Sequence, residues 1–322
     1  MNNTYLLDSI KASFTHKKVG KYLRENIIKP GVSLKEIASI TENKIKEFIN
    51  YDPENPLEKG IAFPVGLSIN NCAAHYTPNY NDLDIFLKDS DILKIDYGVH
   101  YNGIIIDSAF TMHFDSKYDE FIKVSKDVTD FAVKQCGPDA ILGEIGKEIE
   151  DFVHSYEIEI NGKLVQLKTM KDLCGHLISR YEIHAGKAVP NTSIFYPLRM
   201  IENEFYAIEP FITTGNGISI IKGENSHLML NKNNLEEKIN NSIYDIVKKH
   251  FHTLPFCKKW LHELYIEDAG NINNLLNNLI EQKILNEYPP LYDIENSIIS
   301  QFEHTIFIKN NGVINLTKNN FY

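Results

Sequence analysis

The sequence of 322 residues predicts an α+β fold that carries a helical insert. Three observations predict this class. Apolar residues recur at helical spacing near the N-terminus, strand-forming residues flank the turn dipeptide Asn102-Gly103, and residues 232–285 are Asn-rich with a helical pattern. No Gly-, Ser- or Pro-rich linker divides the chain, so we expect one domain over residues 1–322, with the insert at about 231–291.

The individual elements follow from local signals. The first 30 residues predict a helix that is stopped by Pro30-Gly31, and Ser33 with Glu36 forms a capping box in front of a second helix. Residues 50–66 are rich in Pro and Gly and are expected to form a loop. The other expected elements are helices at about 118–136 and 142–156, a hairpin over 157–167 around Asn161-Gly162, and strands at Phe205–Thr213 and Gln301–Lys309.

Asp96 and Asp107 are the most informative pair of residues. If Asn102-Gly103 forms a two-residue turn, cross-strand partners have numbers that sum to 205, and Asp107 faces Gly98. The two carboxylates are then diagonal neighbours on one face, about 7–8 Å apart at Cα. They could be solvent-facing residues of an amphipathic hairpin, but the flanking Ile95, Ile104, Ile105, Ile106 and Phe110 favour a buried ribbon. Two buried like charges repel, so we expect a cation between them.

Further polar residues stand in apolar or small-residue surroundings. Glu209 is the lone acid of one predicted strand, and Glu303 is the acid of another. His176, His184 and His75 lie beside Gly or Ala. Each alone is more often a solvated or hydrogen-bonded residue. Together, four carboxylates and one imidazole would neutralise two divalent cations, and such ligands suit Mn, Fe, Co or Zn.

Composition excludes several function classes. The net charge of −10 and pI near 5.7 argue against a general nucleic-acid surface, which requires a basic face. No apolar run reaches the ~18 residues of a membrane span, and the N-terminus has no export signal. The four cysteines are scattered, so we expect reduced thiols in a cytoplasmic protein.

The ordered set of candidate ligands and several longer motifs resemble the methionine aminopeptidases, in particular their type 2 branch. The motifs are NNCAAHYTPN, KIDYG, IIDSAFT, GHLISRYEIHAGKAVP, YAIEPF, SHLMLN, PFCKKWL, EYPPLYDI and QFEHTI. They run from about residue 61 to 309 and cover most of the chain. The resemblance implies the pita-bread fold, with a helical insert between the last two ligands.

The resemblance also implies a role for each candidate ligand in a site for two divalent metal ions. Asp107 and Glu303 would bridge both ions. Asp96 would hold the second ion alone, and His176 and Glu209 would hold the first. The ions could be Mn, Co, Fe or Zn, because the ligand types do not choose among these metals.

Catalytic roles are implied for three residues. Glu209 would accept a proton from the attacking water, and His184 would donate a hydrogen bond toward the scissile carbonyl or the peptide backbone. His75 would lie at the mouth of the site, near the incoming or departing nitrogen. It is also the position that fumagillin-type epoxides alkylate in this family, so we expect sensitivity to these inhibitors.

The substrates implied are peptides and nascent chains with an N-terminal Met and a small second residue. Phe63, Ile183 and His227 would surround the Met side chain, since a thioether fits an adaptable apolar pocket with nearby aromatic edges. Tyr288, from the insert, would lie near the next residue. Many type 2 enzymes have a charged N-terminal extension linked to ribosome contact; here the catalytic domain starts almost at once, so we expect at most a transient contact.

Two other classes of protein with the same fold are alternatives to a methionine aminopeptidase. Proline-directed peptidases such as prolidase share the fold but usually have an additional N-terminal domain, and only about 60 residues precede FPVG here. A catalytically silent pita-bread protein that binds RNA or ribosomes would lack metal ligands and carry basic tails, whereas all five ligand positions are filled here. We therefore expect an enzyme, a metal-dependent methionyl aminopeptidase.

Overall fold

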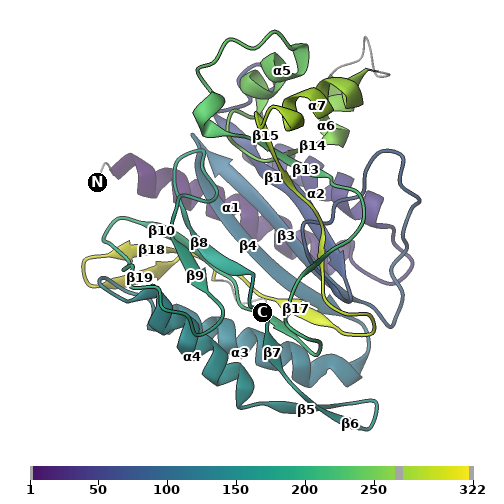
Figure 1. Ribbon diagram of the computed structural model, residues 1–322, viewed down its shortest axis with the longest axis vertical. Helices are drawn as coiled ribbons and strands as arrows, with labels where there is room; N and C mark the ends of the chain where they lie inside the picture. Colours follow the sequence, from purple (N-terminus) through teal and green to yellow (C-terminus); the bar gives the residue numbers. More distant parts are fainter. Residues whose placement is uncertain (1–2, 265–270, 319–322) are drawn as a thin grey trace.

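The structure is a computed structural model that describes residues 3–264 and 271–318 (Figure 1). Helices and antiparallel sheets both occur throughout, so the α+β prediction is confirmed. Two sheets, each covered by a pair of helices, form two halves, and a smaller group of elements lies above them in Figure 1. Among the described residues, no helix is both long and apolar enough to cross a bilayer.

The first half is a three-stranded sheet of order β1-β3-β4 that packs against two helices. Its helices and strands are α1 (Asn3–Asn26), α2 (Leu34–Ile49), β1 (Lys59–Ile69), β3 (Ile92–Tyr101) and β4 (Ile104–His113). The side chain of Ser33 accepts a hydrogen bond from the backbone N–H of Glu36 at 3.1 Å, so the predicted start of the second helix is confirmed. Leu23, Ile37 and Tyr97 are fully buried between the helices and the sheet.

The prediction of a loop over residues 50–66 is wrong in its second part, because β1 begins at Lys59. Pro64 and Gly66 disfavour a regular strand, which is why the local sequence indicated a loop. The ladder with β3 accommodates them through two register shifts, between Ile61 and Phe63 and between Phe63 and Gly66. β1 is also the edge strand of its sheet, where a residue without an N–H is tolerated.

The second half is a five-stranded sheet of order β19-β18-β10-β8-β9, with α3 and α4 packed against it. Its elements are α3 (Asp119–Gln135), α4 (Leu142–His154), β8 (Cys174–Ile178), β9 (Ala188–Pro190), β10 (Phe205–Ile208), β18 (His304–Lys309) and β19 (Gly312–Asn315). Both predicted helices are confirmed. The predicted hairpin is also confirmed, as β5 (Glu157–Ile160) and β6 (Lys163–Gln166), with positive φ at Asn161 and Gly162.

The two long strands predicted at 205–213 and 301–309 are each interrupted, so their predicted continuity is wrong. β10 is followed by β11 (Phe211–Thr213), and β18 is preceded by β17 (Ile299–Gln301). β11 and β17 pair with each other in a separate sheet that includes β7 (Lys168–Thr169). The chain therefore changes sheet at Glu209-Pro210 and at Phe302-Glu303, and both glutamates lie in the gaps.

Hydrogen bonds join the two halves along β4. Glu303 donates its backbone N–H to the carbonyl of Ala109 at 3.0 Å, and Asp107 donates its backbone N–H to Thr305 Oγ1 at 2.8 Å. Ser108 Oγ donates to the carbonyl of Glu303 at 2.5 Å. The junction therefore fixes Asp107 and Glu303 relative to each other through their backbones.

The predicted insert contains three helices and part of a small sheet of order β14-β13-β15. These elements are β13 (His227–Leu230), α5 (Ser242–His250), β14 (Phe256–Cys257), α6 (Lys258–Leu264), α7 (Ile272–Glu281) and β15 (Leu285–Tyr288). Residues 265–270 of the predicted insert lie outside the described residues. The elements that remain are β2 (Cys72–Ala74), β12 (Ile220–Ile221), β16 (Leu291–Tyr292) and the short 3-10 helices η1 (Ser116–Tyr118) and η2 (Lys232–Asn234).

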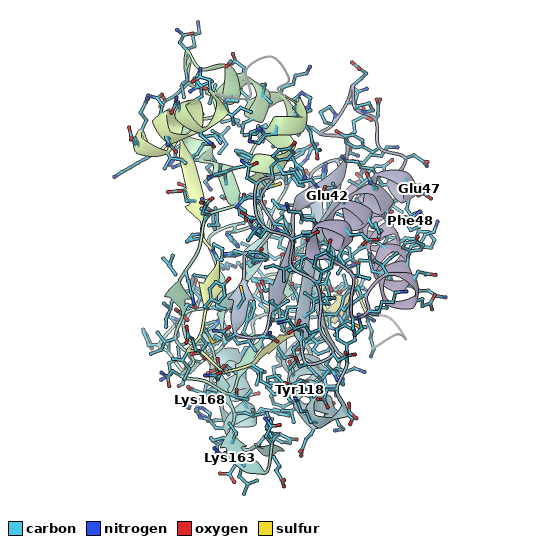
Figure 2. All side chains as sticks on the ribbon, turned by 90° about the vertical axis from the view of Figure 1, so that its right-hand side faces the viewer. Glu42, Glu47, Phe48, Tyr118, Lys163 and Lys168 are labelled. Carbon is cyan, nitrogen blue, oxygen red and sulfur yellow. The ribbon has the colours of Figure 1, made fainter. Side chains whose placement is uncertain are left out.

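A buried carboxylate attaches the insert to the first half. Glu42, which is labelled in Figure 2, lies on α2 and is buried. Its carboxylate accepts hydrogen bonds from Lys259 Nζ at 2.8 Å and from Trp260 Nε1 at 3.0 Å. Lys259 and Trp260 belong to α6. The insert also has its own apolar core, which includes Tyr244 and Leu276. A defined polar contact therefore holds the insert on α2.

We predict that Gly175→Ala destabilises the fold by roughly 1–3 kcal/mol, a typical cost of overpacking. A Cβ at Gly175 would lie 2.3 Å from the backbone carbonyl oxygen of Ala207, so β8 and β10 would have to separate. Urea unfolding followed by circular dichroism measures the change in unfolding free energy. Gly137→Ala is the matched control, because a Cβ there has nothing within 4 Å. Equal stability of both variants would contradict the prediction.

Candidate metal centre

Asp96 and Asp107 come together as the hairpin argument predicts. In the β3–β4 ladder, Asp107 pairs with Gly98 and Asp96 pairs with Ala109, so the partner numbers sum to 205. The expected register is confirmed. Asp107 is 4% exposed and Asp96 is half-buried, and both line the same cavity. The acids therefore belong to the interior and not to a solvent-facing side of the hairpin.

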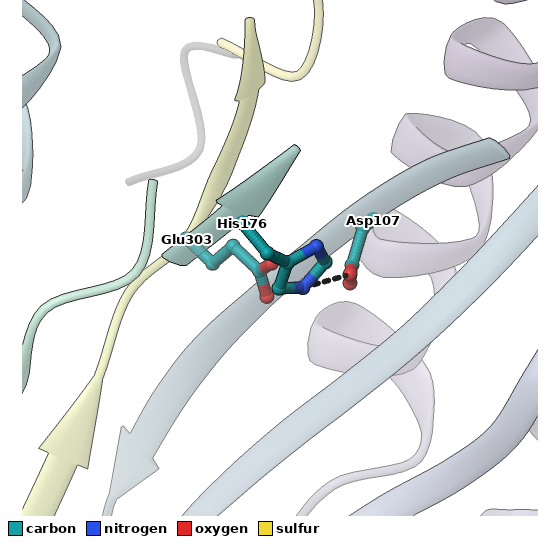
Figure 3. Close-up of side chains that lie close together, drawn as sticks. All are labelled: Asp107, His176 and Glu303. Atoms are coloured by element: carbon teal, nitrogen blue, oxygen red, sulfur yellow. Dashed lines mark ion pairs between the residues drawn. The ribbon is translucent and has the colours of Figure 1, made fainter. Parts of the chain in front are cut away.

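The other three candidate ligands reach this point from the second half. His176 lies in the middle of β8, and its Nε2 is 3.5 Å from Asp107 Oδ2 and 3.3 Å from Glu209 Oε1. Asp107, His176 and Glu303 each offer one ligand atom, and these atoms all lie within 4.8 Å of one another (Figure 3). Three strands and two strand breaks therefore bring all five predicted residues to one place.

Burial and mutual repulsion make the anionic forms of these acids costly. Burial raises the pKa of Asp96 to about 6. Burial also raises the pKa of Asp107, Glu209 and Glu303 well above the usual range, and the charges of the neighbouring carboxylates raise these pKa values further. Without bound cations, these carboxyl groups would therefore bind protons, and the protons would neutralise their negative charge.

Several carboxylate oxygens in the centre have no hydrogen-bond partner in the part of the chain that the structure describes. They are Asp96 Oδ1, Asp107 Oδ1 and both side-chain oxygens of Glu303. Buried polar atoms are normally satisfied, so these unpaired oxygens indicate a missing partner. Oxygens from four acids with one imidazole nitrogen form a suitable ligand set for divalent cations. The residues present fit metal ions.

Gln301 is a residue of the centre that the sequence did not identify. Its Nε2 donates to Asp96 Oδ2 and to Glu209 Oε2, at 3.2 Å in both cases. Gln301 is 1% exposed. Hydrogen bonds of this kind orient ligands around a metal. The sequence did contain one signal for Gln301: it is a polar amide two residues before Glu303, on the same face of the predicted strand.

A cavity of about 270 Å³ opens beside the acids. All the residues predicted to bind substrate line it, together with the polar residues Asp172 and Cys174, which the sequence did not identify. The predicted residues are Phe63, His75, Ile183, His184, His227 and Tyr288. Four of the five predicted ligands, Asp96, Asp107, His176 and Glu209, thus line the same cavity as the predicted substrate contacts, although these residues come from both halves and the insert.

An arc of aromatic rings follows the cavity wall. His176 and His184 are in edge contact with ring centroids 4.4 Å apart, and Tyr288 is 5.9 Å from both His184 and His75. His227 continues the arc, 5.9 Å from His75. His75 has φ of +64°, an uncommon left-handed conformation for a residue that is not Gly.

Burial keeps the histidines of the arc neutral at physiological pH. It lowers the pKa of His75 to about 4 and the pKa of His184 to about 3, and neighbouring imidazoles add to both shifts. A neutral imidazole has one N–H donor and one acceptor nitrogen. The wall can therefore donate and accept hydrogen bonds without adding positive charge beside the metal ligands.

Comparisons with known proteins identify the family of this chain. The model of metallopeptidase family M24 matches residues 10–233. Methionine aminopeptidase 2 of Komagataella phaffii is 41% identical over 310 residues, which cover 94% of this chain and 67% of that protein. Methionine aminopeptidase of Thermotoga maritima has a TM-score of 0.66 at 20% identity, with 99% of this chain and 98% of that chain covered.

A further solved structure, of a thermophilic Arx1, has a TM-score of 0.83 at 16% identity and covers 100% of this chain and 92% of that chain. At such identities the solved structures show the fold alone, and the predicted pita-bread fold is confirmed. The resemblance to type 2 methionine aminopeptidases is confirmed by the curated relative and the family model. The chain is therefore an aminopeptidase that belongs to metallopeptidase family M24, in the branch of methionine aminopeptidase 2.

Proposed function

We propose that the protein removes the N-terminal Met from peptides and nascent proteins whose second residue is small, with two divalent metal ions in its centre. One observation carries the proposal: four acids and one histidine, drawn from both halves, converge beside a cavity. The names of the relatives support the substrate class. The unpaired buried oxygens support the use of metal.

In this proposal, Asp107 and Glu303 would hold both ions. The supporting observations are that both carboxylates are almost fully buried and that each has at least one oxygen without a partner among the described residues. Asp96 would hold one ion, and His176 with Glu209 would hold the other. Gln301 lies between the two outer carboxylates, Asp96 and Glu209, and orients both. The ligands suit Mn, Co, Fe or Zn.

The bound ions would lower the pKa of a water molecule and polarise the scissile carbonyl. Glu209 accepts the proton of the attacking water, and its Oε2 is fixed by Gln301. His184 donates its single N–H toward the carbonyl oxygen as negative charge develops there. His75 lies near the peptide nitrogen. Its unusual backbone conformation supports a functional role, because such strain collects at functional sites.

The Met side chain occupies the apolar part of the cavity, between Phe63, Ile183 and His227. A thioether is flexible and polarisable, so it packs well against aromatic edges. Tyr288 lies near the second residue and comes from β15, which pairs with β13. A bulky second residue would meet this wall. The small-residue preference follows from that steric limit.

Three further expectations belong to the same proposal and rest on the family resemblance. They are a cytoplasmic location, a transient contact with ribosomes, and modification of His75 by fumagillin-type epoxides. The alternative of a catalytically silent protein that binds RNA or ribosomes is not favoured, because all five candidate ligands are present and lie together. The similarity to Arx1 bears on the fold alone.

Release of Met from Met-Ala-Ser and Met-Lys-Ser peptides tests the function directly. Protein stripped of metal should be inactive, and refilling it with Mn²⁺ or Co²⁺ should restore cleavage of Met-Ala-Ser. Cleavage of Met-Lys-Ser should remain at least about 10-fold slower, because small steric differences in a pocket have effects of this size. Folded, metal-loaded protein that cleaves neither peptide would contradict the proposal and favour the silent protein.

Glu303→Gln should lower the affinity for metal by at least about 10- to 100-fold. Metal content and turnover should therefore fall together. The substitution keeps the shape of the side chain but removes an anionic ligand. The metal-free variant should be at least as stable as the metal-free wild type at neutral pH, because the free-energy cost that accompanies the raised pKa of the buried Glu303 carboxyl is removed. Metal analysis, peptide assays and urea unfolding give the three readouts. Glu236→Gln, at an exposed position, is the control, and full activity of Glu303→Gln would refute the bridging role.

His75→Asn should reduce kcat/KM by about 100-fold or more, as expected for a residue that acts in proton transfer or orientation. Asn tolerates the left-handed backbone conformation, so the substitution separates the loss of the imidazole from backbone strain. Metal content should stay within about twofold of the wild type. If the metal is lost together with the activity, His75 is a ligand and its proposed role is wrong.

A further inference from the structure

A buried threonine contacts one of the cavity histidines. Thr77 Oγ1 lies 2.6 Å from His227 Nε2 and 2.7 Å from the backbone carbonyl oxygen of Val65. Thr77 is 1% exposed and His227 is 6% exposed. Thr77 follows β2, and its hydroxyl links Val65 of β1 to His227 of β13, which lines the cavity.

The two distances determine where the protons lie. A hydroxyl has one proton, and a carbonyl oxygen can only accept. If Thr77 gave its proton to His227, its lone pairs would face the lone pairs of the Val65 carbonyl at 2.7 Å. Both contacts are favourable in one arrangement only: His227 Nε2–H donates to Thr77, and Thr77 donates to Val65.

The ring of His227 carries one N–H, because it is neutral. Burial holds the pKa of His227 well below its usual value, and the nearby His75 lowers it further, so the ring is neutral. A neutral imidazole with Nε2 protonated has a lone pair on Nδ1. The other ring nitrogen therefore has no proton to offer to a ligand.

We propose that Thr77 is a positioning residue that fixes the Nε2-protonated tautomer of His227, so that the ring of His227 presents an acceptor and no donor to the cavity. The inference rests on the proposed function for its substrate. A thioether sulfur is a weak acceptor that does not need a donor from the wall. A first residue whose side chain has a strong acceptor and no donor, such as methionine sulfoxide, meets a lone pair and is disfavoured.

Thr77→Val is the direct test, because Val keeps the shape of Thr and removes the hydroxyl. His227 Nε2–H would then be buried against a methyl group, and the ring would shift its proton to Nδ1 to satisfy a partner in the cavity. Discrimination between Met-Ala-Ser and its sulfoxide in kcat/KM should fall by about 10-fold, the effect of one unpaired buried group. Thr77→Ser keeps the hydroxyl and should retain the wild-type discrimination.

The tautomer can be measured without activity. ¹⁵N chemical shifts of the histidine rings, recorded on the zinc-loaded protein and assigned with a His227→Gln variant, distinguish the two tautomers. The wild type and Thr77→Ser should show Nε2 protonated, and Thr77→Val should show the proton moved to Nδ1. An Nδ1-protonated ring in the wild type, or an unchanged tautomer in Thr77→Val, overturns the inference.

The two failures are distinguishable. If no Met peptide is cleaved by any form, the proposed function fails, and the nitrogen shifts alone decide whether Thr77 sets the tautomer. If Met peptides are cleaved and the tautomer shifts in Thr77→Val without any loss of discrimination against the sulfoxide, the selectivity role is refuted.

Discussion

Electrostatic repulsion among Asp96, Asp107, Glu209 and Glu303 is the constraint on which the rest of this structure depends. Moving an ionised carboxylate out of water costs several kcal/mol, and here four share one interior site. Without cations, the acids respond by raised pKa values, with burial as the largest cause. The metal-free fold must therefore hold the acids together against a force that favours their separation, and divalent cations reverse the sign of that force.

Hydrogen bonds of the backbone hold two of these acids, Asp107 and Glu303, in place against the repulsion. Asp107 lies inside a regular hairpin, and its N–H is bound by Thr305 on the other half. Glu303 is fixed by its own N–H on Ala109 and by its carbonyl, which accepts from Ser108. These bonds use main-chain groups, so the carboxylates remain free for ligands. The two side chains are thus held by their backbones, while Asp107 Oδ1 and both carboxylate oxygens of Glu303 have no hydrogen-bond partner among the described residues, which is the arrangement a metal centre needs.

Features of the fold and the centre that are caused by neighbouring residues in the sequence could be predicted, whereas features caused by contacts between distant segments were harder to predict. The proximity of Asp96 and Asp107 on one face of the hairpin followed from a turn dipeptide and the two-residue period of a strand, and the register is as expected. The break at Glu209 was not predictable in this way, because it arises when β10 and β11 join different sheets. β1 was misjudged for a related reason, since pairing with β3 overrides the preferences of Pro64 and Gly66. Two hydrogen bonds between distant residues were missed: Gln301 is 92 residues from Glu209 in the chain, and His227 is 150 residues from Thr77.

The acids and one wall of the cavity come from different parts of the chain. The candidate ligands lie at the junction of the two halves, whereas Tyr288 lies in β15 of the insert and pairs across the ladder with His227 in β13. The insert has its own core and is held on α2 by Glu42. A substitution in the insert can therefore move this part of the cavity wall without moving any carboxylate of the centre. Because the junction depends on charge and the wall depends on packing, the shape of the cavity can change while the arrangement of the four acids stays the same.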